Sequence, residues 1–289
     1  MEGYLIHFTI LIAIYSLLTL SLQLSIGFAG LLNLGHIAFY AIGGYSSSLL
    51  SLQGMDFLSS ILIAGILSSF FACCLSFPTN KLKGDYFAVA TMGFSFVVYE
   101  ISLNWVSLTK GPMGLVGIPR PDILGFVLNQ NIHFLFLCLF FLIFSYLSLS
   151  FIVRSPFGRV VQSIRDDELA AKILGKNTNK VKRIVLSVSA FFAGIAGGLY
   201  AHYINYIDPD SFTVMELIPV LCIVIIGGLG SLKGTLIATF VLVLLPEPLR
   251  FIGFSSDVIG PARQIIYAVL LICILIYRPK GLYGRFDLK

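Results

Sequence analysis

Long apolar runs dominate this 289-residue chain and limit what it can fold into. Nine runs, each roughly the ~20 residues that a helix needs to cross a bilayer, cover residues 4–26, 31–52, 57–77, 86–106, 133–153, 184–205, 214–230, 234–250 and 262–277. Only 11% of the residues are charged, against about 25% in soluble domains. The runs are longer than the ~10 residues of a membrane barrel strand and lack its alternation of polar and apolar residues. We therefore predict an all-α fold, a polytopic membrane bundle of about nine spanning helices.

One long polar stretch, residues 154–183, interrupts the apolar runs and is called the basic loop below. It carries eight Lys/Arg residues and three acidic residues. Loops rich in Lys and Arg stay in the cytoplasm. If the basic loop is cytoplasmic and the runs alternate outward from it, fifteen of the nineteen Lys/Arg residues lie inside. We therefore expect an external N-terminus, a cytoplasmic C-terminus and a first run that is retained, because it lacks the positive start of a cleaved signal peptide.

A short amphipathic helix is predicted within the basic loop, over residues 163–175. Ser163 and Asp166 have the form of a capping box at its start. Glu168 precedes a lysine by four residues, which is the spacing of a stabilising ion pair on a helix. Gly175 is a natural stop, because glycine accepts the left-handed conformation that ends many helices.

One face of this predicted helix is apolar although it lies outside the membrane runs. Four residues form it: Leu169, Ala170, Ile173 and Leu174. An apolar face in the cytosol has to be covered. It either packs on the membrane domain or the lipid headgroups of its own side, or enters a groove on a partner protein.

The second run, residues 31–52, contains a stripe of small and polar residues at helical spacing. Asn33, His36 and Tyr40 belong to this stripe. One interpretation is close helix packing, which small residues allow. The other is that these three residues line a solute path near the middle of the bilayer, because polar groups in lipid usually face an interior or a cavity. The link from the first run is only a few residues long around positions 27–30, so two helices are tightly joined or one is broken there.

Other polar candidates lie near the ends of runs predicted to be external. Glu100 and Asn104 are four residues apart on one face, and an ionised glutamate deep in lipid is costly, so we expect an interfacial position, with a solute contact as the alternative. Glu216 has the same ambiguity. The Gly- and Pro-rich segment 109–121, with Gly111 as a candidate pathway residue, is either a loop of turns or a lid over a solute path.

The residues do not support an enzyme or a nucleotide site within this chain. The glycine-rich residues 227–235 resemble a phosphate-binding loop around Lys233. Such a loop needs Gly directly before the lysine and Ser or Thr directly after it, but here Leu232 and Gly234 occupy these positions. The four histidines are scattered over different runs, and five cysteines within apolar runs argue against a disulfide framework and against a metal site. We expect no bound cofactor and no nucleic-acid partner, since the net charge of +5 follows from the cytoplasmic loops.

Six motifs occur in a fixed order along the chain. They are GLLNLGHIAFYAIGGY (30–45), KGDYFAVATMGFS (83–95), TKGPMGLVGIP (109–119), SPFGRVVQSIRDDELAAKILGKN (155–177), SAFFAGIAGGLY (189–200) and GGLGSLKGTLIA (227–238). Together they resemble the LivM-type permease subunit of bacterial branched-chain amino acid ABC importers, over roughly residues 25–280. Four positions depart from that family's usual pattern: Lys83 for Arg, Lys110 for Gly, Lys233 for an aromatic residue and Thr235 for Pro.

The resemblance implies a single permease domain over residues 1–289 in the bacterial plasma membrane. It implies a cytoplasmic coupling helix at residues 163–175, on which an ATPase subunit docks. The candidate coupling residues are Arg165, Asp166, Asp167, Glu168, Leu169, Ala170, Ala171 and Gly175. Expected partners are a homologous LivH-like permease, two cytosolic LivG- and LivF-like subunits that bind ATP and magnesium, an extracytoplasmic substrate-binding protein and membrane lipid.

The implied function is import of leucine, isoleucine or valine, driven by ATP hydrolysis in the partner subunits. A related importer for urea, short amides or other neutral amino acids has the same signature and is the alternative. A stand-alone secondary transporter or channel is less consistent, because its spans need charged residues for ion coupling. A membrane enzyme needs a clustered catalytic set that the scattered histidines do not supply.

Overall fold

A computed structural model describes residues 2–82, 84–123, 126–128, 130–246, 256–278 and 281–284. Its long helices are α1 (Glu2–Gln23), α2 (His36–Leu52), α3 (Phe57–Thr79), α4 (Asp85–Asn104), α6 (Asn131–Arg154), α9 (Thr178–Ile204), α10 (Val214–Gly227), α11 (Leu232–Leu244) and α13 (Ser256–Tyr277). Shorter helical elements are the π-helix η1 (Leu24–Phe28), α5 (Val106–Thr109), η2 (Gly111–Met113), α7 (Pro156–Asp166), α8 (Glu168–Ile173) and η3 (Pro209–Phe212). Four two-residue strands complete the described elements: β1 (Leu115–Val116), β2 (Asp122–Ile123), β3 (Phe126–Val127) and β4 (Tyr206–Ile207).

The predicted all-α bundle is confirmed, and the described part of each of the nine predicted runs overlaps one of the long helices; residues 247–250 of the run 234–250 lie outside the described residues. Within the described residues, six segments are long and apolar enough to cross a membrane: Gly3–Phe28, Phe57–Thr79, Asp85–Asn104, Asn131–Arg154, Thr178–Ile204 and Pro209–Gly227. The chain is therefore a multi-pass membrane protein. Leu232–Leu244 and Gln264–Ile274 are shorter apolar helical segments, and α2 has only 17 residues, so the count of nine spans stays a prediction.

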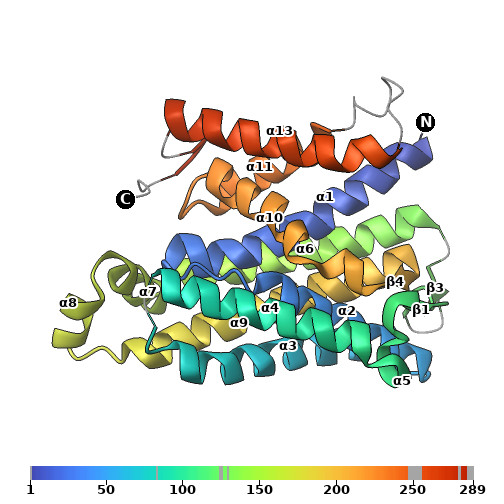
Figure 1. Cartoon of the computed structure of the whole chain (residues 1–289), viewed down its shortest axis with the longest axis horizontal. Coiled ribbons are helices and arrows are strands. Elements are labelled where there is room, and N and C mark those ends of the chain that lie inside the picture. Colours follow the sequence, from blue (N-terminus) through green and yellow to red (C-terminus); the bar gives the residue numbers. More distant parts are fainter. Residues whose placement is uncertain are drawn as a thin grey trace.

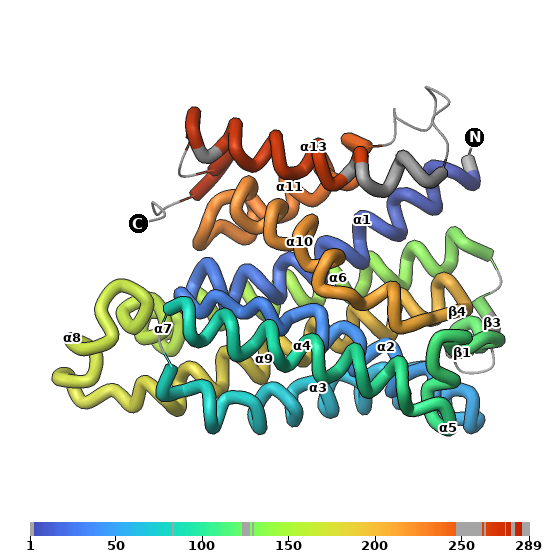
Figure 2. The backbone as a smooth tube through the Cα atoms, viewed as in Figure 1, coloured from blue at the N-terminus to red at the C-terminus, as the bar shows by residue number. Residues whose placement is uncertain are grey.

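The long helices lie side by side, and the short helices and strands that connect them lie at the two ends of the bundle. α7 and α8 lie at one end, and α5 lies near β1 and β3 at the opposite end (Figure 1). α9 packs along α2 and α3 in the most extensive helix contacts of the bundle. α13 lies beside α10 and α11, away from α2 and α3 (Figure 2), and Tyr267 packs there in a small apolar cluster.

α2 and α9 approach closely because glycines face each other between them. A methyl group at Gly197 would collide with the backbone carbonyl of Tyr40, and one at Gly43 would collide with the backbone of Gly194. The absence of a side chain at these positions lets two backbones come into contact, as in many membrane helix pairs. The small residues of the second run therefore do serve helix packing.

The chain is broken between α1 and α2, which is one of the two alternatives that the short link around positions 27–30 left open. α1 continues into η1, residues 29–35 are not helical, and α2 begins only at His36. The prediction that the second helix starts at residue 31 is wrong for this stretch, since Gly30 has a φ of 67° that ends the helix. Asn33 accordingly lies in the linker, where its Oδ1 accepts a hydrogen bond from the Gly35 backbone at 3.1 Å, and not on a helical stripe.

The basic loop contains two helices where one was predicted. α7 begins after Ser155, whose hydroxyl accepts a bond from the Gly158 backbone at 3.2 Å, and it runs through Ser163. The predicted capping box at Ser163 is therefore wrong: its hydroxyl donates to the Val160 carbonyl, as it does inside a helix. The chain breaks instead at Asp167, whose extended backbone (φ −153°, ψ 105°) separates α7 from α8.

Candidate functional site

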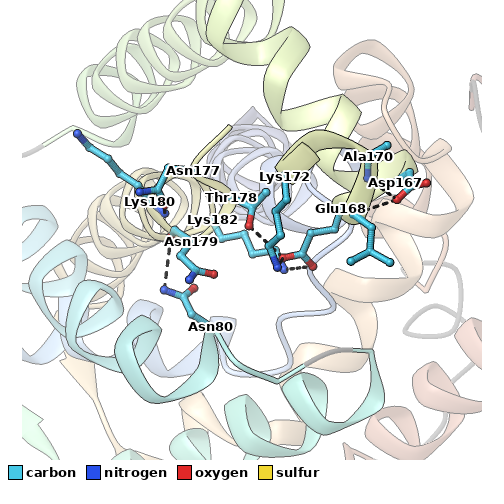
Figure 3. Close-up of polar contacts among 11 residues, drawn as sticks. Asn80, Asp167, Glu168, Ala170, Lys172, Asn177, Thr178, Asn179, Lys180 and Lys182 are labelled. Carbon is cyan, nitrogen blue, oxygen red and sulfur yellow. Dashed lines mark hydrogen bonds and ion pairs between the residues drawn. The ribbon is translucent and has the colours of Figure 1, made fainter. Parts of the chain in front are cut away.

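Glu168 is the centre of the polar contacts at the α7–α8 end of the bundle. Its Oε1 is 2.9 Å from Lys172 Nζ, the ion pair that the spacing predicted, and accepts a hydrogen bond from Thr178 at 3.1 Å. Its Oε2 is 2.7 Å from Lys182 Nζ. Figure 3 shows these three side chains converging on Glu168. Since Thr178 and Lys182 belong to α9, the carboxylate fastens α8 to the first turns of a long membrane helix.

The electrostatics of Glu168 follow from these neighbours. Partial burial by itself raises the pKa of the carboxyl, but the bonds from Lys182, Lys172 and Thr178 outweigh it and lower the pKa from 4.5 to about 2. Lys182 in turn is 8% exposed, so its ammonium depends on this carboxylate for compensation. Glu168 is therefore ionised at neutral pH.

α8 presents an apolar face that nothing within the described chain covers. Leu169, Ile173 and Leu174 are 61%, 86% and 76% exposed, whereas Ala171 on the opposite face is 3% exposed. The helix is only six residues long, so it depends on its ends for stability.

Both ends of α8 are fixed by local contacts. Asp167 Oδ1 accepts hydrogen bonds from the backbone of Leu169 at 2.8 Å and Ala170 at 3.0 Å. Gly175, with a φ of 75°, turns the chain back just after the helix, as its position predicted. Asn177 then caps α9 through the Lys180 backbone at 3.0 Å (Figure 3).

Arg165 joins the basic loop to the break between α1 and α2. Its Nη1 donates to the backbone carbonyl of Gly27 at 2.9 Å, and its Nη2 is 2.7 Å from Asp166 Oδ1. A side chain at Gly30 would strike the aliphatic part of Arg165, so the arginine lies directly against the broken segment. Neither this contact nor that of Lys182 was predicted from the sequence. The one signal for the latter was the position of Lys182 just before the apolar run 184–205, which Lys180 and Arg183 share.

The eight predicted coupling residues lie close together because they are neighbours in sequence. Their contacts and their exposure to solvent differ. Arg165 and Asp166 end α7, Asp167 caps α8, and Glu168 holds α9. Leu169 and Ala170 are exposed, whereas Ala171 is buried.

The predicted pathway residues are not brought together by the fold. His36 is fully buried, with Nε2 2.8 Å from Ser21 Oγ, and Asn33 is fully buried in the linker. Glu100 and Asn104 are bonded to each other at 2.9 Å and line an exposed groove on α4. Gly111 is a buried turn residue with a φ of 58°.

Tyr40, the sixth candidate, lines a cavity of about 350 Å³ between α1, α2, α9, η3 and α10, called the acidic cavity below. The residues that define it are Tyr15, Tyr40, Tyr200, Asp208, Asp210 and Glu216. A second cavity of about 310 Å³, called the apolar cavity, adjoins it and shares Tyr15, Tyr200 and Glu216. Glu216, for which the sequence left an interfacial position and a solute contact open, thus lines both cavities.

The Gly- and Pro-rich segment is folded by turns and pinned to the end of α9. β1 pairs with β4, with Leu115 opposite Ile207. His202 Nδ1 is 2.8 Å from the Pro119 carbonyl, and Asn205 donates to the Ile118 carbonyl at 2.8 Å. The segment is therefore the loop of turns that its composition indicated.

Comparison with known proteins agrees with this architecture. The family model described as "Branched-chain amino acid transport system / permease component" matches residues 4–275. The high-affinity branched-chain amino acid transport system permease protein LivM of Escherichia coli K12 is 33% identical, over 93% of this chain and 67% of that protein. A probable branched-chain amino acid transport permease protein LivM of Methanocaldococcus jannaschii is 27% identical, over 93% and 90% of the two chains. Permease protein LivH of Salmonella typhimurium is 25% identical, over 95% and 92%. No solved structure matches the chain.

Proposed function

This chain belongs to the branched-chain amino acid transport permease family, and on that premise we propose that it is the membrane-spanning permease of an ABC importer for leucine, isoleucine and valine. Relatives named as permeases of this transport system support the substrate class. ATP hydrolysis belongs to partner subunits, and no step of it takes place on this chain.

The observation that carries the proposal is the uncovered apolar face of α8. A six-residue helix with two exposed large apolar residues, and a third directly after it, is unstable in water unless a partner covers this face. Its place at the polar end of the bundle suits a cytosolic protein with a matching groove. We assign this groove to an ATP-binding subunit, with a second such subunit on a homologous permease.

The contacts of the basic loop provide two routes for force from that subunit. Glu168 connects α8 to α9 through Lys182, and α9 packs along α2 and α3. Arg165 connects the end of α7 to Gly27 in η1. Closure of the ATP-binding subunits would displace α7 and α8 together, and these contacts would tilt α9 and shift the broken segment, so that access alternates between the two sides of the membrane.

The remaining partners and the orientation follow from the same proposal. The α7–α8 end faces the cytosol because it carries most of the positive charge. The N-terminus is then external and the C-terminus cytoplasmic. A LivH-like permease completes the pathway, and an extracytoplasmic binding protein delivers the solute.

Reconstitution of the complete importer in liposomes tests the proposal. We expect ATP-dependent uptake of labelled leucine from its binding protein and no comparable uptake of labelled urea. Ile173→Glu, on the exposed face of α8, should abolish co-purification of the ATP-binding subunit. Met113→Glu is the matched control, since Met113 is 82% exposed and lies in the chain between α5 and β1, which are at the opposite end of the bundle (Figure 1). Retention of the subunit by Ile173→Glu would contradict the docking assignment, and preferred uptake of urea would contradict the substrate.

A further inference from the structure

A further cavity, of about 350 Å³, lies where the end of α6 meets the start of α11 and is called the cationic cavity below. Arg154 and Lys233 line it, one from each helix, and none of its described lining residues is acidic. Neither side chain makes an ion pair or a hydrogen bond with another described residue. Because two positive charges at one cavity repel each other, the local potential attracts an anion.

The wall of the cationic cavity also supplies hydrogen-bond donors. α11 begins at Leu232, and the first N–H groups of a helix have no acceptor within that helix. The Ser231 hydroxyl accepts the hydrogen bond of the Gly234 N–H at 3.1 Å, so the N–H groups of Leu232 and Lys233 remain for a ligand. The partly buried Ser150 adds a hydroxyl from α6. These groups suit the oxygens of a phosphate.

Arg154 lies at the end of an apolar stripe on the surface of α6. Phe140, Ile143, Leu147 and Phe151 are each more than half exposed, and their spacing of three or four residues continues to Arg154. α6 has 24 residues, which is enough to cross a bilayer. Acyl chains can therefore cover this stripe, which leads to a cation at its polar end.

Lys233 has the corresponding position on α11. Ile237, Phe240 and Val241 are exposed and follow Lys233 on one face of the helix. α6 and α11 both pack against α1, and Phe28, in η1 directly after α1, is part of the cavity wall. Two exposed apolar stripes therefore lead to the same cavity, and each has a cation at its polar end.

We propose that the cationic cavity binds the headgroup of an anionic phospholipid, whose acyl chains lie along the stripes of α6 and α11. Arg154 and Lys233 donate hydrogen bonds to the phosphate oxygens, which is the chemistry of basic lipid pockets between membrane helices. A zwitterionic lipid fits less well, because its headgroup brings a cation to a described wall that has no acid. Free phosphate has suitable charge but no chains to cover the stripes.

The bound lipid acts at a junction of the permease. Arg154 is the last residue of α6, and Ser155 caps α7 directly after it. Tyr283 also lines the cavity, and its backbone N–H donates to the Gly227 carbonyl at 3.2 Å, at the end of α10. One headgroup therefore links the start of the basic loop to α10 and α11, whichever solute the permease carries.

Native mass spectrometry of the purified full-length chain tests the site. The probe is dioleoyl phosphatidylglycerol, and the comparison lipid is dioleoyl phosphatidylcholine, which has the same acyl chains. We expect phosphatidylglycerol to stay bound under conditions that remove phosphatidylcholine, and excess inorganic phosphate not to displace it. Equal retention of the two lipids would show binding by acyl chains only, and displacement by inorganic phosphate would assign the cavity to a soluble anion. Either result would overturn the proposal.

Charge-removing variants locate the site on the chain. Arg154→Gln and Lys233→Gln should each weaken phosphatidylglycerol binding about fivefold, which is the contribution of one basic residue near an anionic membrane surface. Arg159→Gln and Lys176→Gln are the matched controls, because both residues are exposed in the basic loop and neither lines the cationic cavity. Equal losses in the cavity variants and the controls would show a diffuse attraction to the basic loop and overturn the site.

A second measurement decides if a cavity variant cannot be purified. A phosphatidylglycerol with a photoreactive acyl chain is cross-linked to the wild-type protein, and the labelled peptides are identified. Adducts on residues 140–151 or 237–241 support the site, whereas adducts confined to other segments would overturn it. Solute uptake is no part of either measurement, so failure of the proposed transport function would leave the lipid result standing.

Discussion

The guanidinium of Arg165 donates a hydrogen bond to the backbone carbonyl of Gly27 at 2.9 Å, across 138 positions of the sequence. The contact joins the end of α7 to η1, where the first membrane helix loses its regular α-helical bonding. π-helical turns occur frequently at functional sites. The arginine is therefore well placed to carry motion of the basic loop into the membrane domain.

Arg165→Ala should separate ATP hydrolysis from transport. We expect the importer to assemble and to hydrolyse ATP, but to lose most of its stimulation by the loaded binding protein and most of its leucine uptake. Arg159→Ala, an exposed residue of the same helix α7, is the control and should behave as wild type. Normal uptake in Arg165→Ala would show that the Gly27 contact is structural only.

Glu168→Gln should destabilise the junction of α8 and α9. The substitution leaves the buried ammonium of Lys182 without its carboxylate, which we expect to cost about 1–3 kcal/mol of unfolding free energy. The double variant Glu168→Gln with Lys182→Met should cost less than the sum of the single variants, because it removes both charges. Thermal unfolding of the purified permease measures all three, and strict additivity would argue against the pairing.

The same pair predicts a pH dependence. Because the pKa of Glu168 is lowered from 4.5 to about 2, its stabilisation is fully present above pH 4.5 and is lost as the pH falls through about 2. We expect the wild-type protein to lose stability relative to Glu168→Gln over this interval and to show a constant difference from it at neutral pH. A difference that instead changed between about pH 6 and 8 would point to another titrating group.

Gly197→Ala should disrupt the packing of α2 against α9. The added methyl group meets the backbone carbonyl of Tyr40, which cannot move without shifting α2, so we expect a loss of about 1–3 kcal/mol or failure to express. Gly93→Ala is the matched control: Gly93 also lies within a membrane helix, α4, and a methyl group there meets nothing within 4 Å. It should be neutral or slightly stabilising, by up to about 1 kcal/mol. Equal effects of the two substitutions in thermal unfolding would contradict the close approach.

Features that depend on neighbours along the chain could be predicted from the amino-acid sequence. Apolar runs of sufficient length predicted the positions of the long helices, because lipid leaves backbone groups no other partner. The ion pair of Glu168 with Lys172 and the reversal at Gly175 followed from helical spacing and from the conformation that glycine accepts. The short link near Gly27 narrowed the possibilities to two tightly joined helices or a broken helix, and the structure shows the break.

The tertiary structure decided what depends on residues far apart in sequence. The break at Asp167 moved the predicted cap away from Ser163, because α7 begins earlier, at Pro156, and its own hydrogen bonds continue through the serine. Likewise, no periodicity relates Lys182 to Glu168 or Arg165 to Gly27, since these pairs meet only when separate elements pack. The acidic cavity is the clearest case: Tyr15, Tyr40 and Glu216 come from three helices, and only the packing of those helices brings their polar groups to one space.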